Sequence, residues 1–252
     1  MKKLIAANWK MNKNSEESSA FVKELKKLVG DSDNADILIC PPFTSISAVS
    51  HEIKGSTIKL GAQNMYFEES GAFTGEVSAS MLKDAGCEYV ILGHSERREI
   101  FGEIDEFVNE KIIAALKHGL KPILCVGETW EERSSEQTED ILESQLLKCL
   151  REVEEIEKVT IAYEPLWAIS KGDPNKKSAT KNDAEDSHRF IREVIAGIYG
   201  EESSKKVRIL YGGSMKPENA KELLEMPNID GGLVGNASLK PESFAKIIES
   251  CK

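Results

Sequence analysis

The sequence predicts an α/β protein built as a (β/α)8 barrel, a closed cylinder of eight parallel strands covered by helices. Short and almost wholly apolar runs, which are typical of strands buried on both faces, recur along the chain. Most of these runs are followed by a segment with apolar residues at helical spacing. No linker or shift in composition separates the repeats, so we expect one catalytic domain over residues 1–252.

The predicted strands are short apolar runs bounded by turn residues or polar segments. In chain order they are Leu4–Asn8, Ala35–Cys40, Ile58–Gly61, Tyr89–Leu92, Ile123–Val126, Val159–Tyr163, Val207–Tyr211 and Gly232–Val234. The first predicted helix has Ser15 as its candidate N-cap and Gly30 just past its end. The predicted helices are Ser15–Val29, a short one from Thr44, Val77–Ala85, Ile104–His118, a long charged one over Ser134–Val153, Ala184–Tyr199, Glu218–Glu225 and Glu242–Ser250.

A doubly wound open sheet is the alternative fold for this alternation of strands and helices. No Gly-x-Gly-x-x-Gly pattern follows the first strand, and such a pattern is typical of the dinucleotide-binding form of that fold. The count of eight units therefore favours the barrel.

The long loop Gln63–Glu76 interrupts the alternation, and loops of this length in compact domains are usually functional or disordered. It carries Phe67, Phe73 and the pair Thr74-Gly75, and its apolar groups are costly to leave in water. We therefore expect this loop to dock into a second subunit and to form a homodimer.

Composition and charge exclude several classes of function. The chain has 252 residues, 40% of them hydrophobic, and no apolar run approaches the ~20 residues of a membrane span. A net charge of −10 argues against nucleic acids and anionic membranes as partners, although it leaves small anions open. The apolar run near the N-terminus is too short for a signal peptide, so we expect a cytoplasmic protein.

Cysteine and histidine usage gives no indication of a metal site. The five cysteines are scattered without a Cys-x-x-Cys pair, which predicts reduced thiols. The four histidines form no His-Glu-x-x-His or similar ligand spacing. We expect neither a metal nor a cofactor.

In a barrel, the chemistry lies where the strands end at the carboxyl face. Asn8 and Lys10 follow the first strand, and if the chain stays extended there, both point to the same side. His94 and Glu96 follow the fourth strand, and Glu164 ends the sixth, where Pro165 keeps it out of the helical region. These five residues are expected to meet at one rim.

Two further strand ends are rich in glycine, namely Gly212-Gly213-Ser214 after the seventh strand and Gly235-Asn236 after the eighth. Small residues leave backbone N–H groups free to face a ligand, and a helix start nearby favours an anion. Each motif alone is more often a tight turn. Together, at positions where barrels often hold phosphate, they predict a phosphate site.

The predicted groups suit proton abstraction next to a carbonyl, through an enediolate and without a cofactor. Glu164 would be the base, and His94 at a helix N-terminus would be a neutral donor, because that position disfavours positive charge. Lys10 would stabilise the developing anion. Taken singly, each has a bland alternative: a solvated carboxylate, a structural histidine, and a surface cation paired with Glu96.

The motifs together resemble the triosephosphate isomerase family over essentially the whole chain. They are Asn8-Trp9-Lys10-Met11-Asn12, Gly93-His94-Ser95-Glu96-Arg97-Arg98, Tyr163-Glu164-Pro165-Leu166-Trp167-Ala168-Ile169, Tyr211-Gly212-Gly213-Ser214 and Leu233-Val234-Gly235-Asn236-Ala237-Ser238-Leu239. The resemblance implies a cofactor-independent interconversion of dihydroxyacetone phosphate and D-glyceraldehyde 3-phosphate, in glycolysis and gluconeogenesis.

The resemblance also implies roles for the site residues. Glu164 becomes the base and His94 the electrophile. These are the roles known for the family, and the resemblance implies them here. Lys10 and Asn8 become electrostatic and positioning partners, with Glu96 organising Lys10. The implied phosphate-binding N–H groups lie near Ser170, Ser214, Gly235 and Asn236. The family's counterpart of the loop Gln63–Glu76 forms the dimer contact.

The chain departs from the family pattern at two places. Asn236 stands where the family has a second glycine, but asparagine tolerates unusual backbone angles and keeps its N–H. After Ile169, Ser170 replaces a glycine, and the segment before Lys177-Ser178-Ala179 is longer than in the family. We expect this polar flap to close over the site and its longer tip to be tolerated.

Two other functions compete with the isomerase. A phosphate-binding aldolase would use Lys10 as a Schiff base, and borohydride would trap its substrate there. A binding or scaffold protein without catalysis is the second, and the presence of Asn8, Lys10, His94 and Glu164 argues against it.

Overall fold

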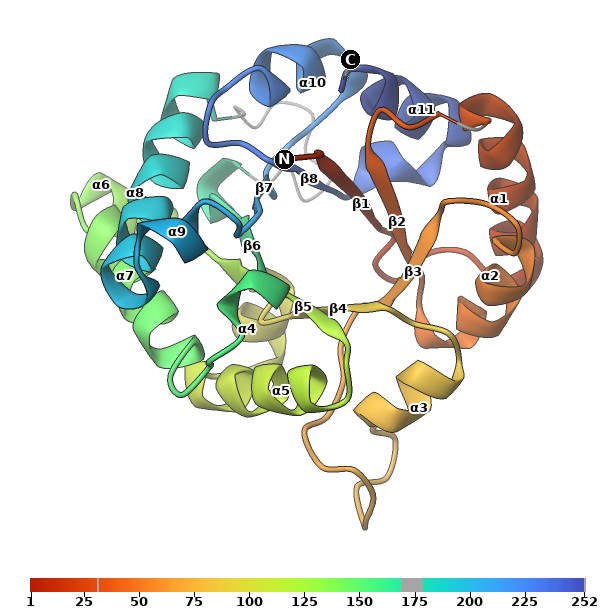
Figure 1. The fold of residues 1–252 in the computed structure, drawn as a ribbon, viewed down its shortest axis with the longest axis horizontal. Coiled ribbons are helices and arrows are strands. Elements are labelled where there is room, and N and C mark those ends of the chain that lie inside the picture. Colours follow the sequence, from red (N-terminus) through yellow and green to blue (C-terminus); the bar gives the residue numbers. More distant parts are fainter. Residues whose placement is uncertain (31, 169–178, 252) are drawn as a thin grey trace.

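The computed structural model describes residues 1–30, 32–168 and 179–251, and the longer flap tip and Ser170 lie outside them. The eight strands form a closed, all-parallel barrel in the order β1 to β8 (Figure 1). They are β1 Leu4–Asn8, β2 Asp36–Cys40, β3 Lys59–Ala62, β4 Tyr89–Leu92, β5 Lys121–Val126, β6 Thr160–Tyr163, β7 Ile209–Tyr211 and β8 Gly231–Val234. The predicted barrel is confirmed, and the open sheet is wrong.

The barrel closes where β1 pairs with β8, with Leu4 opposite Gly231. Gly231 has a φ of 149°, and a β-carbon on it would lie 1.9 Å from the carbonyl oxygen of Leu4. Only glycine fits so close to a neighbouring backbone. This single residue therefore permits the last strand pairing.

A ring of helices surrounds the barrel (Figure 1). The α-helices are α1 Ser15–Val29, α2 Ile46–Glu52, α3 Ala79–Asp84, α4 Ser95–Phe101, α5 Asp105–Lys117, α6 Trp130–Ser134, α7 Thr138–Cys149, α8 Lys181–Tyr199, α9 Glu201–Ser204, α10 Pro217–Leu224 and α11 Pro241–Glu249. Short 3₁₀ turns are η1 Phe43–Ser45, η2 Ile156–Lys158, η3 Leu166–Ala168 and η4 Asn236–Leu239. None of the helices within the described ranges is long and apolar enough to span a bilayer.

Alternate residues of most strands supply two layers of core. In β1, Leu4 and Ala6 belong to the cluster inside the barrel. Ile5 and Ala7 belong to the cluster between strands and helices, which also contains Phe21 of α1. Burying a side chain of this size contributes about 1.5–3 kcal/mol, so the double coverage explains why the strands are apolar on both faces.

Two local predictions were wrong. The N-cap of α1 is Asn14 rather than Ser15, because the Asn14 side chain accepts from the Glu17 N–H and Glu17 accepts in return, a reciprocal capping box. The long helix expected over residues 134–153 is shorter at both ends, because α7 covers only Thr138–Cys149. Ser134 is the last residue of the separate helix α6, and Glu136 lies in the left-handed region between the two helices at φ 58°. A left-handed residue cannot continue a right-handed helix.

Candidate active site

Three strand ends meet at the carboxyl rim of the barrel. Asn8 is the last residue of β1, His94 caps the start of α4 just after β4, and Glu164 follows β6 directly. All three side chains are buried. The structure therefore brings together titratable groups that are far apart in the sequence.

The Glu164 carboxylate is held at both oxygens. Its Oε1 lies 2.9 Å from Nε2 of His94, and its Oε2 accepts the backbone N–H of Ser95 at 2.8 Å. The Glu164 N–H donates to the carbonyl of Val126, which fixes the chain where β6 ends. With its side chain 3% exposed, Glu164 presents a desolvated and precisely oriented carboxylate to the barrel rim.

The hydrogen bonds of His94 assign its tautomer. Nδ1 accepts the backbone N–H of Glu96 at 3.2 Å, as a side-chain cap of α4. A nitrogen that accepts carries no proton, so in this arrangement the ring is neutral and its proton lies on Nε2. That proton points to Glu164, and the imidazole can serve as a neutral donor.

Opposing effects act on the pKa of Glu164. Burial raises it, because the charged form is poorly solvated. Contacts with His94, the Ser95 N–H and the Lys10 ammonium lower it by more, so the pKa lies below its ordinary value. The carboxylate is therefore ionised at neutral pH and ready to accept a proton.

Lys10 is placed by a strained backbone. It has a φ of 54°, so the chain after β1 does not stay extended, and that expectation was wrong. Its N–H donates to Oδ1 of Asn8 at 3.1 Å, and its carbonyl accepts from Nε2 of Gln63 at 2.9 Å. Its ammonium lies 2.7 Å from Oε1 of Glu96. Backbone strain held by surrounding hydrogen bonds is typical of functional sites.

The glycine-rich ends of β7 and β8 border the same site. A β-carbon on Gly235 would find Cε of Lys10 as its nearest neighbour, at 3.6 Å. Gly235 opens η4, whose Ser238 hydroxyl is tied to the Val234 and Gly235 carbonyls. The loop after β8 therefore lies against the Lys10 side chain, with Asn236 exposed at its start.

Ser214 follows β7, where Gly213 allows a tight turn. A β-carbon on Gly213 would lie 2.3 Å from the Tyr211 hydroxyl. Ser214 is partly exposed, and its carbonyl accepts from Nδ2 of Asn219 in α10. The turn therefore depends on glycine and is fastened to the next helix.

Two residues around the site were not singled out from the sequence. Gln63 opens the long loop and ties Lys10 to the end of β2 through the Cys40 carbonyl. Glu128, fully buried after β5, accepts from Nε1 of Trp167 at 2.8 Å and from the Tyr163 hydroxyl at 3.0 Å. Burial raises the pKa of Glu128. No sequence motif indicates either residue, because both act through partners far along the chain.

Within residues 1–30, 32–168 and 179–251, no set of three or more His, Cys, Asp or Glu residues is arranged to hold a metal ion.

Comparison with known proteins gives consistent results along the chain. The sequence profile of the triosephosphate isomerase family matches residues 3–251. The triosephosphate isomerase of Carboxydothermus hydrogenoformans is 54% identical over 250 residues, covering 98% of each chain. That of Aquifex aeolicus is 51% identical over 251 residues, covering 99% of this chain and all of its own.

A solved structure agrees with these sequence matches. The crystal structure of triosephosphate isomerase from Bartonella henselae superposes with a TM-score of 0.90 at 40% identity, covering 99% of both chains. The profile match and the two relatives each span nearly the whole length. The chain therefore belongs to the triosephosphate isomerase family of isomerases.

Proposed function

We propose that this site interconverts dihydroxyacetone phosphate and D-glyceraldehyde 3-phosphate through an enediolate, as a step of glycolysis and gluconeogenesis. The observation that carries the proposal is the contact of Glu164 with His94, beside Lys10 and the glycine-rich loop after β8. A base, a neutral donor, a cation and a phosphate loop are the groups that this reaction requires.

Glu164 takes a proton from the carbon next to the substrate's carbonyl. The electrons of that C–H bond form the enediolate double bond, and negative charge moves to the carbonyl oxygen. Nε2 of His94 gives its proton to this oxygen and takes back the hydroxyl proton from the oxygen on the deprotonated carbon, while the Lys10 ammonium stabilises the negative charge. That carbon becomes the new carbonyl carbon. Glu164 then returns the proton to the neighbouring carbon, which completes the isomerisation.

Three supporting residues hold this arrangement. Asn8 fixes the Lys10 backbone through its Oδ1, and Glu96 orients the Lys10 ammonium. The Ser95 N–H fixes the second carboxylate oxygen of Glu164. Positioning of this kind matters, because a misplacement of about 1 Å can cost ~10²-fold in rate.

The substrate's phosphate is proposed to bind backbone N–H groups at Ser214, Gly235 and Asn236, together with Ser170. The nearness of Gly235 to Lys10 supports this, since a cation and free N–H groups at a helix start suit a dianion. The reaction transfers a proton within one molecule and requires no external oxidant or reductant, so the proposal includes no cofactor.

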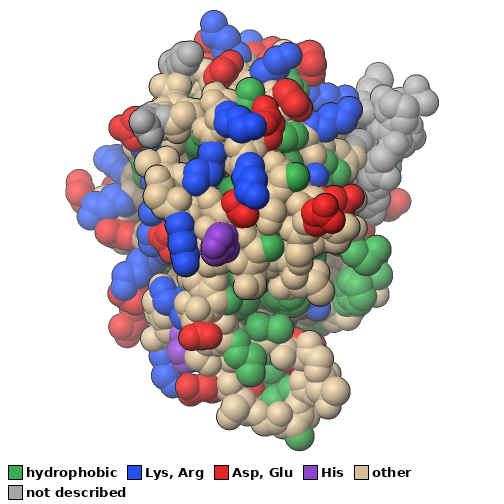
Figure 2. Space-filling view, turned by 90° about the vertical axis from the view of Figure 1, so that its right-hand side faces the viewer, with side chains coloured by type: hydrophobic (Ala, Val, Ile, Leu, Met, Phe, Trp, Pro, Cys, Tyr) green, Lys and Arg blue, Asp and Glu red, His purple; other side chains and the backbone are tan. Residues whose placement is uncertain are grey.

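We also propose a homodimer that forms through the loop Gln63–Glu76. The loop projects from the body between β3 and α3 (Figure 1), and hydrophobic side chains gather beside the projection at the bottom of Figure 2. Phe73 packs on Tyr66 at 4.8 Å between ring centroids and is still 39% exposed. Met11, next to Lys10, is 95% exposed. Exposed apolar groups of this size mark an interaction surface.

The cytoplasm is the proposed location. All five cysteines are free thiols, namely Cys40, Cys87, Cys125, Cys149 and Cys251. Reduced thiols without disulfides are typical of proteins in a reducing compartment.

A coupled assay for dihydroxyacetone phosphate formation from D-glyceraldehyde 3-phosphate tests the proposed function. Turnover without added metal or cofactor is expected. A protein that binds the substrate without turnover would instead be a binding or scaffold protein.

The aldolase alternative is weakened by the Lys10–Glu96 ion pair, because an ammonium held by a carboxylate is a poor nucleophile. Borohydride treatment with substrate should leave Lys10 unmodified. A covalent adduct at Lys10 would favour the aldolase.

A further inference from the structure

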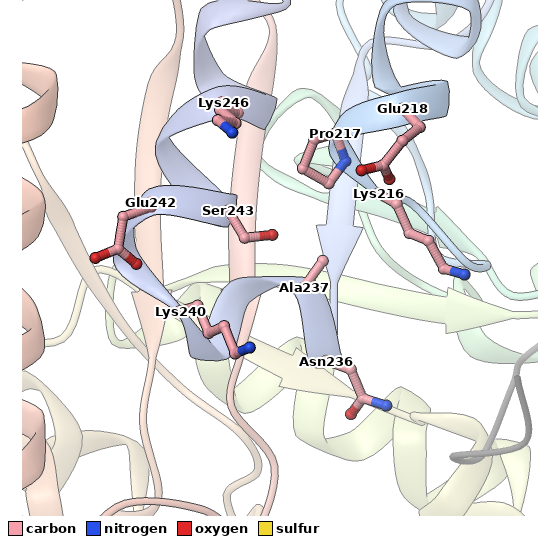
Figure 3. Close-up of a pocket in the computed structure, with 9 residues that line it drawn as sticks. All are labelled: Lys216, Pro217, Glu218, Asn236, Ala237, Lys240, Glu242, Ser243 and Lys246. Carbon is pink, nitrogen blue, oxygen red and sulfur yellow. The ribbon is translucent and has the colours of Figure 1, made fainter.

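A cleft of about 520 Å3 lies behind the loop after β8 and shares Asn236 with the site described above. Its walls are η4 and the start of α11 on one side and the start of α10 on the other (Figure 3). The lining residues are Lys216, Pro217, Glu218, Asn236, Ala237, Lys240, Glu242, Ser243 and Lys246. Its volume lies within the range of small-molecule sites, roughly 300–1,000 Å3.

The cleft is rich in cations although the chain has a net charge of −10. Lys216 is the N-cap of α10, Lys240 is the N-cap of α11 and Lys246 lies within α11. None of the three forms an ion pair with another described residue. By contrast, many of the chain's lysines do form such pairs, among them Lys2, Lys10, Lys23, Lys27, Lys59, Lys111, Lys148, Lys158, Lys206 and Lys221. Three unpaired ammonium groups around one hollow favour an anion.

The remaining lining groups agree with this charge. The Ser243 hydroxyl points into the space beside Ala237, whereas the Glu242 carboxylate points away from it (Figure 3). The starts of two helices border the cleft: α10 begins at Pro217, and α11 begins at Pro241, directly after Lys240. Helix starts add positive potential and N–H donors. Glu218 is the acidic group that opposes an anion here.

The size of the cleft selects the class of ligand. At about 30 Å3 per water molecule, 520 Å3 is far more than one phosphate group fills. A nucleic acid would need a longer basic track than three lysines. We propose that the cleft binds a small anion carrying two or more phosphate groups.

This second site shares a wall with the proposed substrate site. On one side of the turn after β8, Gly235 lies next to Lys10, and on the other, Asn236 and Ala237 line the cleft. An anion in the cleft therefore places negative charge beside the N–H groups proposed to hold the substrate's phosphate. It raises KM for the triose phosphate and leaves kcat unchanged.

Isothermal titration calorimetry with inorganic pyrophosphate at low salt tests the site without using turnover. The double variant Lys216→Gln/Lys246→Gln should bind pyrophosphate at least tenfold more weakly, about 1.4 kcal/mol. Glu218→Gln should bind it more tightly, because the opposing charge is lost. The matched control is Lys205→Gln, which removes an equally unpaired, exposed lysine after α9 and should bind like the wild type.

Lys10→Met distinguishes the two sites, because it alters only the substrate side of the turn after β8. Retained pyrophosphate binding in Lys10→Met, with loss in the double variant, is the expected result. The proposal would be overturned if Lys10→Met lost pyrophosphate binding while the double variant bound pyrophosphate like the wild type. Pyrophosphate would then occupy only the substrate site. Equal binding by the double variant and Lys205→Gln would overturn it as well.

Discussion

Gly212 lies directly against Glu164, and a β-carbon on Gly212 would come within 2.8 Å of the Glu164 Cγ. We predict that Gly212→Ala pushes the carboxylate away from His94 and lowers kcat by about 10²-fold, the cost of a ~1 Å misplacement. The coupled isomerase assay measures the loss. Gly197→Ala is the matched control, because a β-carbon there meets nothing within 4 Å and alanine suits the interior of α8. Full activity in Gly212→Ala would contradict the importance of this contact.

Glu164→Gln should fold normally and lose at least ~10²–10⁴-fold in kcat, because an amide cannot accept the substrate's proton. Its amide oxygen can still accept the Ser95 N–H, which leaves the NH2 group against the Nε2–H of His94, donor to donor. The measurement is kcat, together with the affinity for inorganic phosphate, which should be retained. Near-wild-type turnover would remove Glu164 from the role of base.

Lys10→Met should lower kcat/KM, because the variant loses transition-state stabilisation. The expected loss is on the order of the ~3–4 kcal/mol that removal of one oxyanion donor costs. The ammonium on Glu96 is lost, but the backbone bond to Asn8 does not depend on the side chain. Lys27→Met is a suitable control, since it removes an exposed ion pair with Glu24 far from the site. If Lys10→Met kept the wild-type kcat/KM, as Lys27→Met should, Lys10 would have only a structural role.

The double variant Phe73→Asp/Thr74→Arg should be monomeric and poorly active. A buried carboxylate or guanidinium without a partner costs several kcal/mol at an interface, whereas the same groups are well solvated on a monomer. Sedimentation velocity measures the change of state, with the wild type expected as a dimer. A monomeric wild type at micromolar concentration would refute the proposed loop contact.

The buried His188 should make the folded protein less stable in mild acid. Burial lowers its pKa from 6.5 to about 3, so the folded protein keeps the ring neutral while the unfolded chain protonates it near pH 6.5. Because the unfolded state binds more protons, this contribution is present above about pH 6.5 and is lost as the pH falls toward 3. Between pH 7 and pH 5 the loss is about 2 kcal/mol.

Urea unfolding of the wild type and of His188→Gln at pH 7 and pH 5, at fixed protein concentration, measures this loss of stability. His188→Gln should unfold more easily at pH 7, because the bond from Nδ1 to the Asn228 carbonyl is disturbed, but its stability should change less between pH 7 and pH 5. Parallel slopes for the two proteins would mean that His188 binds the same number of protons in the folded and the unfolded state, which would contradict the lowered pKa of the folded protein.

Local signals explain why much of the fold is predictable from the sequence. The bounds of β1, β4 and α1 coincide with the expected ranges, because an apolar run with clear turn or cap residues determines each of them. The break between α6 and α7 was missed, since neither glycine nor proline accompanies the left-handed Glu136. Tertiary packing rather than propensity sets that boundary.

The candidate site is predictable as a set of residues and not as a geometry. The parallel barrel requires Asn8, His94 and Glu164 to meet at one rim, whatever their spacing in the chain. The left-handed backbone of Lys10 and its contact with Gln63 depend on hydrogen bonds between distant segments. No period or motif encodes such contacts, which is why the sequence predicts the chemistry better than the distances.

Closure of the barrel has a consequence for synthesis of the chain. β1 emerges first but pairs with β8, and the Lys3 ammonium meets the Ile229 carbonyl 226 positions later. At about 5–20 residues per second, a ribosome needs roughly 10–45 s to make that stretch. During this interval one edge of β1 has no partner strand and is open to wrong pairing or to chaperones. We therefore expect the yield of active protein to depend on chaperone capacity during translation.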